Sequence, residues 1–313
     1  MLDVRRLRLL RELAHRGTIA AVAEALAFSP SAVSQQLGVL EREAGLPLLK
    51  RTGRRVRLTP AGHNLVRHAD AVLERLEQAG AELAGARLGL TGALRIGSFP
   101  TATRALVPAA LAALSRRHPG LEPMVRETDP AAVAHALRAG ELDVALVHEY
   151  DFVPAAREPG LATEPLFEEA MYLAAPASAG PAGCPAQTRT GQEEVLRRHA
   201  EAPWITAVPG TLCHAMTVRA CRAAGFEPRI RHQADEFATV LALVAVGQGV
   251  AVVPQLGLTG CDHDRVVLTR LLMARRTLLA FRSGAAGHPG VTALGAALRE
   301  ALPSPLAGSR AIG

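Results

Sequence analysis

Apolar residues recur at helical spacing through the first 45 positions of the chain and predict three short helices. The first helix ends near Gly17 and is indicated by residues three or four positions apart, namely Val4, Leu7, Leu10, Leu13 and Ala14. Thr18 is expected to cap the second helix. That helix has its own apolar side, formed by Ile19, Val22, Ala23 and Leu26. The pattern predicts a compact pair of helices.

The third helix has a detailed start signal. Ser29 is placed as its N-cap and Pro30 as its first helical residue, with Phe28 and Val33 spaced as a hydrophobic staple. The apolar face comprises Val33, Leu37, Leu40 and Ala44, and the opposite face comprises Ser31, Ser34, Gln35, Gly38 and Arg42. Such an outer face suits a helix in the DNA major groove, where glutamine can bond adenine through two atoms and serine can reach a base or a phosphate.

Two short strands are predicted after Gly45, over residues 48–50 and 56–58, with a basic tip between them. A hairpin of this kind is a wing. Its arginines, Arg51, Arg54 and Arg55, are expected to reach phosphates or a narrow minor groove beside the helix contact.

A longer helix should follow from Thr59 and Pro60, which again form an N-cap and a first helical residue. Its apolar positions alternate in steps of four and three: Leu65, Ala69, Val72, Leu76, Ala79, Leu83 and Ala86. This heptad seam predicts that the helices of two chains pair. The alternative is a single amphipathic helix that packs on its own domain.

From Gly92 onward the pattern alternates strands and helices. The first set has strands at 94–97, 123–127 and 143–148, and helices at 106–118 and 130–139. The second has strands near Tyr172 and at 204–207, 230 and 250–253, and helices at 214–224 and 237–246. The chain then returns through 266–269, and a strand at 278–281 and a helix at 292–302 close the first set. This pattern predicts two α/β lobes with open parallel sheets.

Charge is distributed unevenly along the 313 residues. The chain has 35 Lys and Arg against 29 Asp and Glu; the first 62 residues hold 11 and 5 of these, which leaves 24 of each for the rest. Clustered cations at one end suit the neutralisation of DNA phosphates, although a solvated basic surface would have the same composition. With no apolar run of about 18 residues and charges throughout the N-terminus, we expect neither a membrane span nor a signal peptide, and hence a cytoplasmic location.

The run SPSAVSQQLGVLEREAGLPLLKRTGRRVRLTPAG resembles the signature of LysR-type transcriptional regulators. It combines the helix start, the Leu40-Glu41 pair, the wing arginines and the closing Leu58-Thr59-x-Ala61-Gly62. The resemblance implies that Pro30, Ser31, Ser34 and Gln35 approach bases and that Arg51 and Arg54 hold the DNA backbone. We expect Thr18, Ser29 and Arg55 to contact DNA as well.

The C-terminal part is similar to the effector domain of the same family and to periplasmic binding proteins, through the stretches at 139–145 and 246–254. The expected fold class is therefore α/β and multi-domain: a winged helix-turn-helix over 1–59, a dimerisation linker helix over 60–89, a two-lobed effector domain over 90–303 and a tail over 304–313. Lobe I should span about 90–163 and 268–303, and lobe II about 164–267. The implied partners are an inverted-repeat promoter site, a second copy or a tetramer, and RNA polymerase if the protein is an activator, all in the nucleoid.

An effector site is expected where strands of an α/β sheet end. The polar residues at these ends are Ser98, Thr101, Thr103, His148, Thr211 and His214. Two histidines and several helix N-termini make a small carboxylate anion the favoured ligand over a neutral or apolar one. No cofactor and no metal are expected, since the cysteines show no zinc spacing.

Three other functions compete with effector sensing. A peroxide-sensing branch of the family uses cysteines near Cys213 and Cys221, but eight residues of helix separate the two by about 12 Å, beyond the reach of a disulfide. Catalysis is disfavoured because no GxSxG, Walker A, HExxH or GxGxxG sequence is present and no catalytic residue can be assigned. In the last alternative, the C-terminal part is a solute-binding protein joined to the DNA-binding domain by chance. It is disfavoured because the sequence has no secretion signal.

Overall fold

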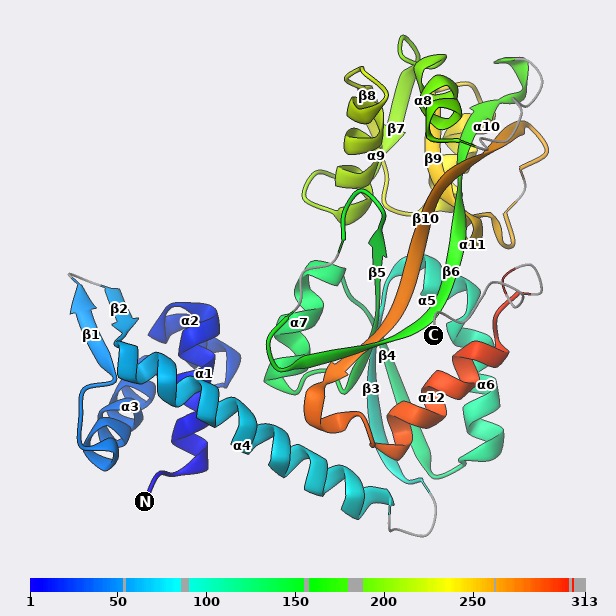
Figure 1. Cartoon of the computed structure of the whole chain (residues 1–313). Helices are drawn as coiled ribbons and strands as arrows, with labels where there is room; N and C mark the ends of the chain where they lie inside the picture. The colour runs from blue at the N-terminus through cyan, green and yellow to red at the C-terminus, as the bar shows by residue number, and fades with distance from the viewer. Residues whose placement is uncertain are drawn as a thin grey trace.

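The computed structural model describes residues 1–52, 55–85, 90–154, 158–179, 188–261, 263–303 and 306. Arg54 and Ala86 lie outside these ranges. Figure 1 shows a small N-terminal domain, a long helix leading away from it and a two-lobed C-terminal part. The α/β multi-domain fold predicted from the sequence is confirmed.

The N-terminal domain consists of three helices and a hairpin: α1 (Val4–Arg16), α2 (Ile19–Ala25), α3 (Pro30–Ala44), β1 (Leu49–Thr52) and β2 (Arg55–Leu58). Each helix begins where the sequence predicts, because the side chains of Asp3, Thr18 and Ser29 accept hydrogen bonds from backbone N–H groups of the first turns. α1 and α3 end at Gly17 and Gly45, which adopt the left-handed conformation that favours glycine. The expected apolar faces meet in one core.

The linker helix α4 (Pro60–Gly85) contacts a different domain near each of its ends. Near its start it packs on α1, where Val66 and Ala69 are buried in the N-terminal core. Near its end it packs on η2 (Ser283–Ala285) of lobe I, and the side chain of Glu77 forms an ion pair with Arg282.

Lobe I is built on the predicted βαβαβ unit. Its elements are β3 (Gly92–Ser98), α5 (Pro100–Ala105), α6 (Val107–Arg117), β4 (Leu121–Glu127), α7 (Pro130–Ala139), β5 (Val144–Tyr150) and α12 (Pro289–Glu300). β3 runs parallel to both β4 and β5. The helix expected over 106–118 is α6, and the short helix α5 before it was not predicted.

Lobe II is formed around a short parallel pair of strands. Its elements are η1 (Ala177–Ala179), α8 (Arg189–Arg197), β7 (Pro203–Thr206), α9 (Leu212–Ala223), β8 (Arg229–Gln233), α10 (Phe237–Ala245), β9 (Ala251–Pro254) and α11 (Gln255–Leu258). α8 was not predicted.

Two long strands connect the lobes and correct the sequence prediction. β6 (Leu161–Pro176) and β10 (Val266–Arg282) pair antiparallel along nearly their whole length, within a sheet of order β4-β3-β5-β10-β6-β9. The strands predicted near Tyr172 and at 278–281 lie within β6 and β10, and the predicted return through 266–269 is the first part of β10. The sequence did not predict that each is one long strand. The irregular pairing between Arg270 and Ala274 marks the point where β10 passes from one lobe to the other.

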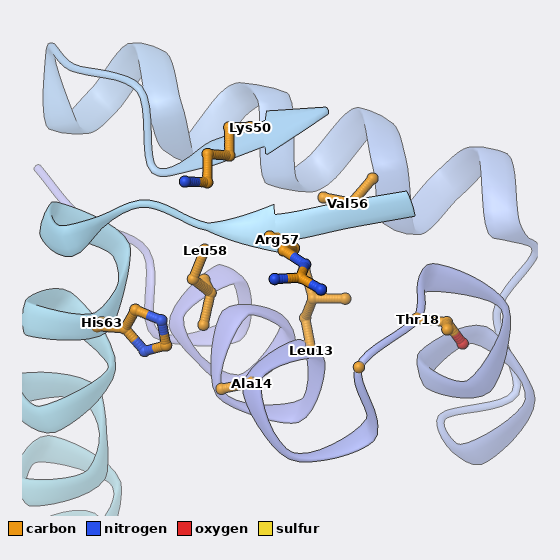
Figure 2. A pocket seen from close by; sticks show the side chains of 9 residues that line it. Leu13, Ala14, Thr18, Lys50, Val56, Arg57, Leu58 and His63 are labelled. Atoms are coloured by element: carbon orange, nitrogen blue, oxygen red, sulfur yellow. The ribbon is translucent and has the colours of Figure 1, made fainter. Parts of the chain in front are cut away.

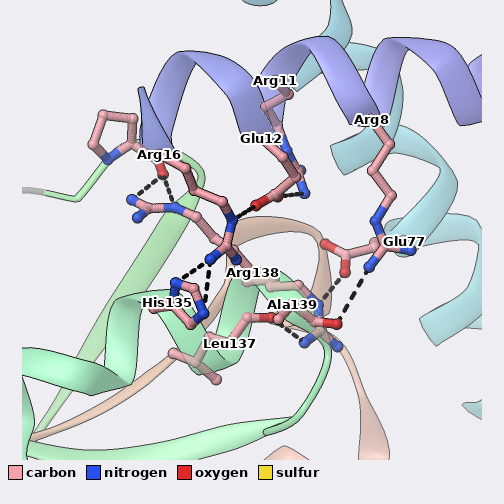
Figure 3. Close-up of polar contacts among 11 residues, drawn as sticks. Arg8, Arg11, Glu12, Arg16, Glu77, His135, Leu137, Arg138 and Ala139 are labelled. Atoms are coloured by element: carbon pink, nitrogen blue, oxygen red, sulfur yellow. Dashed lines mark hydrogen bonds and ion pairs between the residues drawn. The ribbon is translucent and has the colours of Figure 1, made fainter. Parts of the chain in front are cut away.

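The N-terminal domain contacts lobe I through α1 and α7 (Figure 3). On α1, the carboxylate of Glu12 is paired with Arg11 and Arg16, at 3.1 and 2.8 Å. Arg16 also contacts the ring of His135 on α7, and Arg8 donates to the carbonyl of Ala139 at 3.4 Å. One face of lobe I therefore holds both the linker helix and the N-terminal domain.

Candidate functional site

The outer face of α3 is open to solvent over its N-terminal half. Ser31 and Gln35 are exposed and Ser34 is half-buried, while Val33 and Leu37 point into the core. The hydroxyls of Ser29 and Ser31 lie 2.9 Å apart. A side chain added at Gly38 would meet nothing within 4 Å. A flat polar helix face of this kind can enter a major groove.

The N-terminal domain also has a basic groove between the wing, α1 and the starts of α2 and α4 (Figure 2). Lys50 and Arg57 are directly opposite each other in the wing, and both are exposed. Thr18 and His63 also line the groove. Like charges at opposed strand positions destabilise a hairpin, so an anion bound between them would be favourable. Sequence reasoning missed Lys50 and Arg57, because the predicted strands over 48–50 and 56–58 did not fix the register that places these two residues opposite each other.

The wing arginines are described only in part. Arg51 pairs with Val56 and Arg55 with Thr52, next to the tip of the hairpin. The side chains of Arg51 and Arg55 lie outside the described residues, as does the whole of Arg54. Thr18, Ser29 and Pro30 are all exposed at helix starts. The DNA contacts expected of all six residues stay predictions.

A second candidate site is a cavity of about 220 Å³ between the lobes. Three of the six residues expected in the effector site line it, namely Thr101 from α5, His148 from β5 and Thr211 at the start of α9. Thr101 and His148 are 3% and 5% exposed, so their polar groups lie at the closed end of the cavity.

The other three expected residues lie outside this lining. The hydroxyls of Ser98 and Thr103 both donate to the carbonyl of Phe99, at 3.4 and 3.1 Å. His214 has its Nδ1 3.1 Å from the carbonyl of Ala207 and 3.3 Å from the hydroxyl of Thr206. All three side chains bond to nearby groups of the chain.

The cavity floor contains a buried arginine that sequence reasoning did not select. Arg275, on β10, is fully buried and pairs through Nε with Oε1 of Glu169 at 2.7 Å. Its guanidinium carbon lies 5.1 Å from the centre of the Phe99 ring. Burial and the nearby charge of Arg275 hold the pKa of His148 well below its usual range, so that imidazole is neutral.

The described cysteines differ in their surroundings. Cys213 lines the cavity, with its Sγ 2.9 Å from the Tyr150 hydroxyl and 3.9 Å from Nε2 of His148. Burial raises the pKa of its thiol, even though Tyr150 and Arg275 act in the opposite direction. Cys221 is buried on the same helix, and burial raises its pKa to about 12. Neither thiol is ionised at neutral pH.

Among the described residues, no group of three or more His, Cys, Asp or Glu side chains is arranged to hold a metal ion. In the same part of the chain, no helix is both long enough and apolar enough to span a bilayer.

Two family models match this chain. Residues 4–63 match the bacterial regulatory helix-turn-helix protein, lysR family, and residues 87–303 match the LysR substrate binding domain. The first range contains the α3 face and the basic groove, and the second contains the cavity.

Similar proteins cover nearly the whole chain. A probable hydrogen peroxide-inducible genes activator of Streptomyces viridosporus is 32% identical, over 90% of this chain and 88% of its own length. A protein of the same name from Mycobacterium avium is 29% identical, over 95% and 94%. A full-length OxyR variant from Pseudomonas aeruginosa has a similar fold, with a TM-score of 0.65 at 22% identity over 99% of this chain and 98% of its own.

Proposed function

The chain belongs to the LysR family of DNA-binding transcription regulators, and we propose that it reads promoter DNA with α3 and responds to a small molecule held between its lobes. It is a regulator and not an enzyme. The observation that carries this proposal is that one chain has both an exposed polar face on α3 and a cavity between the C-terminal lobes with buried polar residues in its lining.

Base contacts are assigned to α3 and backbone contacts to its surroundings. Ser31, Ser34 and Gln35 face the major groove of the DNA, and Pro30 lets the N-terminus of α3 approach the bases closely. Lys50 and Arg57 neutralise phosphates, together with the three wing arginines and with Thr18 and Ser29 at the helix starts.

The sequence boundaries give the proposed division of labour: DNA binding by 1–59, pairing by 60–89, sensing by 90–303 and no role for the tail. Val72, Leu76 and Leu83 of the heptad seam are 41%, 53% and 71% exposed, although they are apolar. A second copy covers this seam, as a dimer or within a tetramer, so that two α3 helices meet two half-sites of an inverted repeat.

Binding to the promoter region next to its own gene tests the DNA assignment. Gln35→Ala should weaken binding by about 1–3 kcal/mol, measured by fluorescence anisotropy, and should relax the preference at one base position. Gln36→Ala is the matched control, because Gln36 is the next residue on the same helix but its Oε1 accepts from Nε of Arg6 at 2.9 Å. Equal losses from the two variants would contradict the assignment.

A thiol switch is a second candidate, favoured by the position of Cys213 on the cavity and by the names of the two bacterial relatives. Peroxide attack requires a thiolate, and burial opposes its formation here. The test is transcription in vitro with and without peroxide, for the original chain and for Cys213→Ser and Cys221→Ser. An unchanged response in both variants would exclude this candidate.

The remaining partners follow from promoter binding. We place the protein in the cytoplasm on the nucleoid, with RNA polymerase as a partner if it activates transcription. A fluorescent fusion that fails to overlap stained DNA would contradict this location.

A further inference from the structure

The cavity between the lobes has unsatisfied polar atoms at its floor. Nη2 of Arg275 and Nδ1 of His148 are buried and have no hydrogen bond partner within the described part of the chain. Both residues line the cavity. A buried donor left unpaired is costly, so a ligand that supplies an acceptor here binds more tightly. A carboxylate is the group that matches a guanidinium best.

The mouth of the same cavity is acidic. Glu127 and Asp129 from lobe I and Asp235 from lobe II line it, and all three are exposed. The starts of α7, α9 and α10 offer an anion little, because Asp129, Thr211 and Glu236 cap them. The start of α5 has no side-chain cap, but this helix is only six residues long. Three carboxylates against one arginine repel a ligand that carries only negative charge.

We propose that the effector is a small zwitterion, with a carboxylate directed to Arg275 at the floor and a cationic amine directed to Glu127, Asp129 and Asp235 at the mouth. This rests on the proposed function, since it defines the chemical class of the effector in the cavity already assigned. It also replaces the simple anion favoured by the sequence.

The size of the cavity limits the ligand. Its volume of about 220 Å³ is below the roughly 300–1,000 Å³ of pockets that take drug-sized ligands. Amino acids with few carbon atoms fit this limit. The ligand enters when the lobes part slightly and is held when they close again. β10 allows this movement because its pairing with β6 is irregular between Arg270 and Ala274, next to Arg275.

Matched probes separate the two charges of the ligand. Isothermal titration of the full chain should use glycine, L-alanine, β-alanine and 4-aminobutanoate. Each is compared with the carboxylate that lacks its amine (acetate, propanoate or butanoate) and with the amine that lacks its carboxylate (methylamine, ethylamine or propylamine). We expect at least one zwitterion to bind about 10-fold more tightly than both of its partial analogues. A carboxylate that binds as tightly as its zwitterion, or no zwitterion binding at all, would overturn the proposal.

Two variants assign the charges to residues. The double variant Arg275→Met with Glu169→Gln removes the buried pair together and avoids leaving Glu169 unpaired. It should weaken zwitterion binding at least about 30-fold. Asp235→Asn keeps an acceptor for the N–H of Val208, which Asp235 now bonds at 3.0 Å, and should weaken zwitterion binding about 5-fold with no loss for the carboxylate alone.

Promoter binding and thermal unfolding of every variant are measured in parallel. A chain that binds its promoter but no zwitterion refutes this inference and leaves the regulator function standing. A chain that binds zwitterions but no promoter refutes the proposed function instead. An equal loss of binding for Asp235→Asn with zwitterion and carboxylate would also contradict the orientation proposed here.

Discussion

At the scale of single residues, burial keeps two thiols protonated. The pKa of Cys213 is raised and that of Cys221 is raised to about 12, in both cases chiefly by burial. We expect both to react with iodoacetamide at pH 8 at least 10-fold more slowly in the native chain than in urea, measured by mass spectrometry of tryptic peptides. Rapid native alkylation of Cys213 would instead support the thiol switch.

Glu12 should make stability depend on pH. Burial raises the pKa of its carboxyl, but the hydrogen bond from Arg16 and the charges of Arg11 and Arg16 outweigh burial, so the pKa is lowered. A folded pKa below the unfolded value adds stability above the unfolded pKa, and this is lost as pH falls through the folded pKa. Glu12→Gln should therefore reduce the free energy of unfolding by about 2 kcal/mol at pH 7 and by less under acid, measured with urea.

The control for this variant is Glu24→Gln, an exposed residue in the same domain. It should change stability by less than about 0.5 kcal/mol at either pH. His15 and Asp70 also have shifted pKa values nearby, with His15 lowered and Asp70 raised, mainly by burial. The charge of Glu12 raises the pKa of both groups, so Glu12→Gln also lowers their pKa values, and the difference between the variants measures Glu12 together with this coupling. A loss that is the same at both pH values would point to packing.

The structural role of a residue could be predicted where it depends only on neighbours in the sequence. Ser29 caps α3 through a hydrogen bond to Ala32, and its position before Pro30 was sufficient to show this. Arg275 could not be predicted, because its neighbour Arg276 is partly exposed and the two look alike in sequence. Only the pairing of β10 with β6, which brings Glu169 from 106 positions away, buries one of them.

At the scale of elements, close packing of α4 on lobe I depends on one glycine. A Cβ at Gly284 would lie 2.6 Å from Cβ of Glu77 and would also meet the carbonyl of Glu74. Gly284→Ala should lower the free energy of unfolding by about 1–3 kcal/mol and expose α4 to limited proteolysis. Gly287→Ala is the matched control, because nothing lies within 4 Å of its Cβ position, and it should stay within about 0.5 kcal/mol. If the two variants behave alike, the contact does not hold α4.

The exposed seam of α4 makes a separate prediction about assembly. Leu76→Glu places a charge in the seam and should shift the chain to monomers in light scattering. Promoter affinity should fall by at least about 100-fold, because the second half-site contact is lost. Ala71→Glu adds the same charge at an exposed position outside the seam and should leave the mass unchanged. A dimer that survives Leu76→Glu would place the interface elsewhere.

Elements were predictable where periodicity is local, as in α1, α3 and α7. The long strands β6 and β10 were not, because each changes its surroundings where it crosses between lobes. In β10 the apolar residues are interrupted by Arg270 and by Arg275 and Arg276, so the sequence predicted a strand only at 278–281. That β10 is one strand crossing between the lobes becomes clear only from its pairing with β6.

At the scale of the whole molecule, the two lobes differ in their contacts with the N-terminal domain and the linker helix. Lobe I contacts α4 through η2 and the N-terminal domain through α7, while lobe II joins lobe I by β6, β10 and contacts across the cavity. Arg104 of α5 provides such a contact: its guanidinium donates to Glu236 at 3.2 Å, to the carbonyl of Gly257 at 3.2 Å and to that of Thr259. Ligand-driven movement should therefore shift lobe II relative to a unit made of lobe I and the DNA-binding domain.

Removing this contact tests the idea. Arg104→Gln should favour the open arrangement by about 1 kcal/mol, a modest figure because both Arg104 and Glu236 are one-third exposed. The result should be a larger radius of gyration in X-ray scattering without ligand and about 5-fold weaker ligand binding. Arg117→Gln is the control, because Arg117 pairs with Glu300 at 2.7 Å within lobe I alone, and it should change neither quantity. If Arg104→Gln instead alters the distance between the N-terminal domain and lobe I, measured by labels on α2 and α12, then the moving part is the DNA-binding domain and the division into a fixed and a moving unit is wrong.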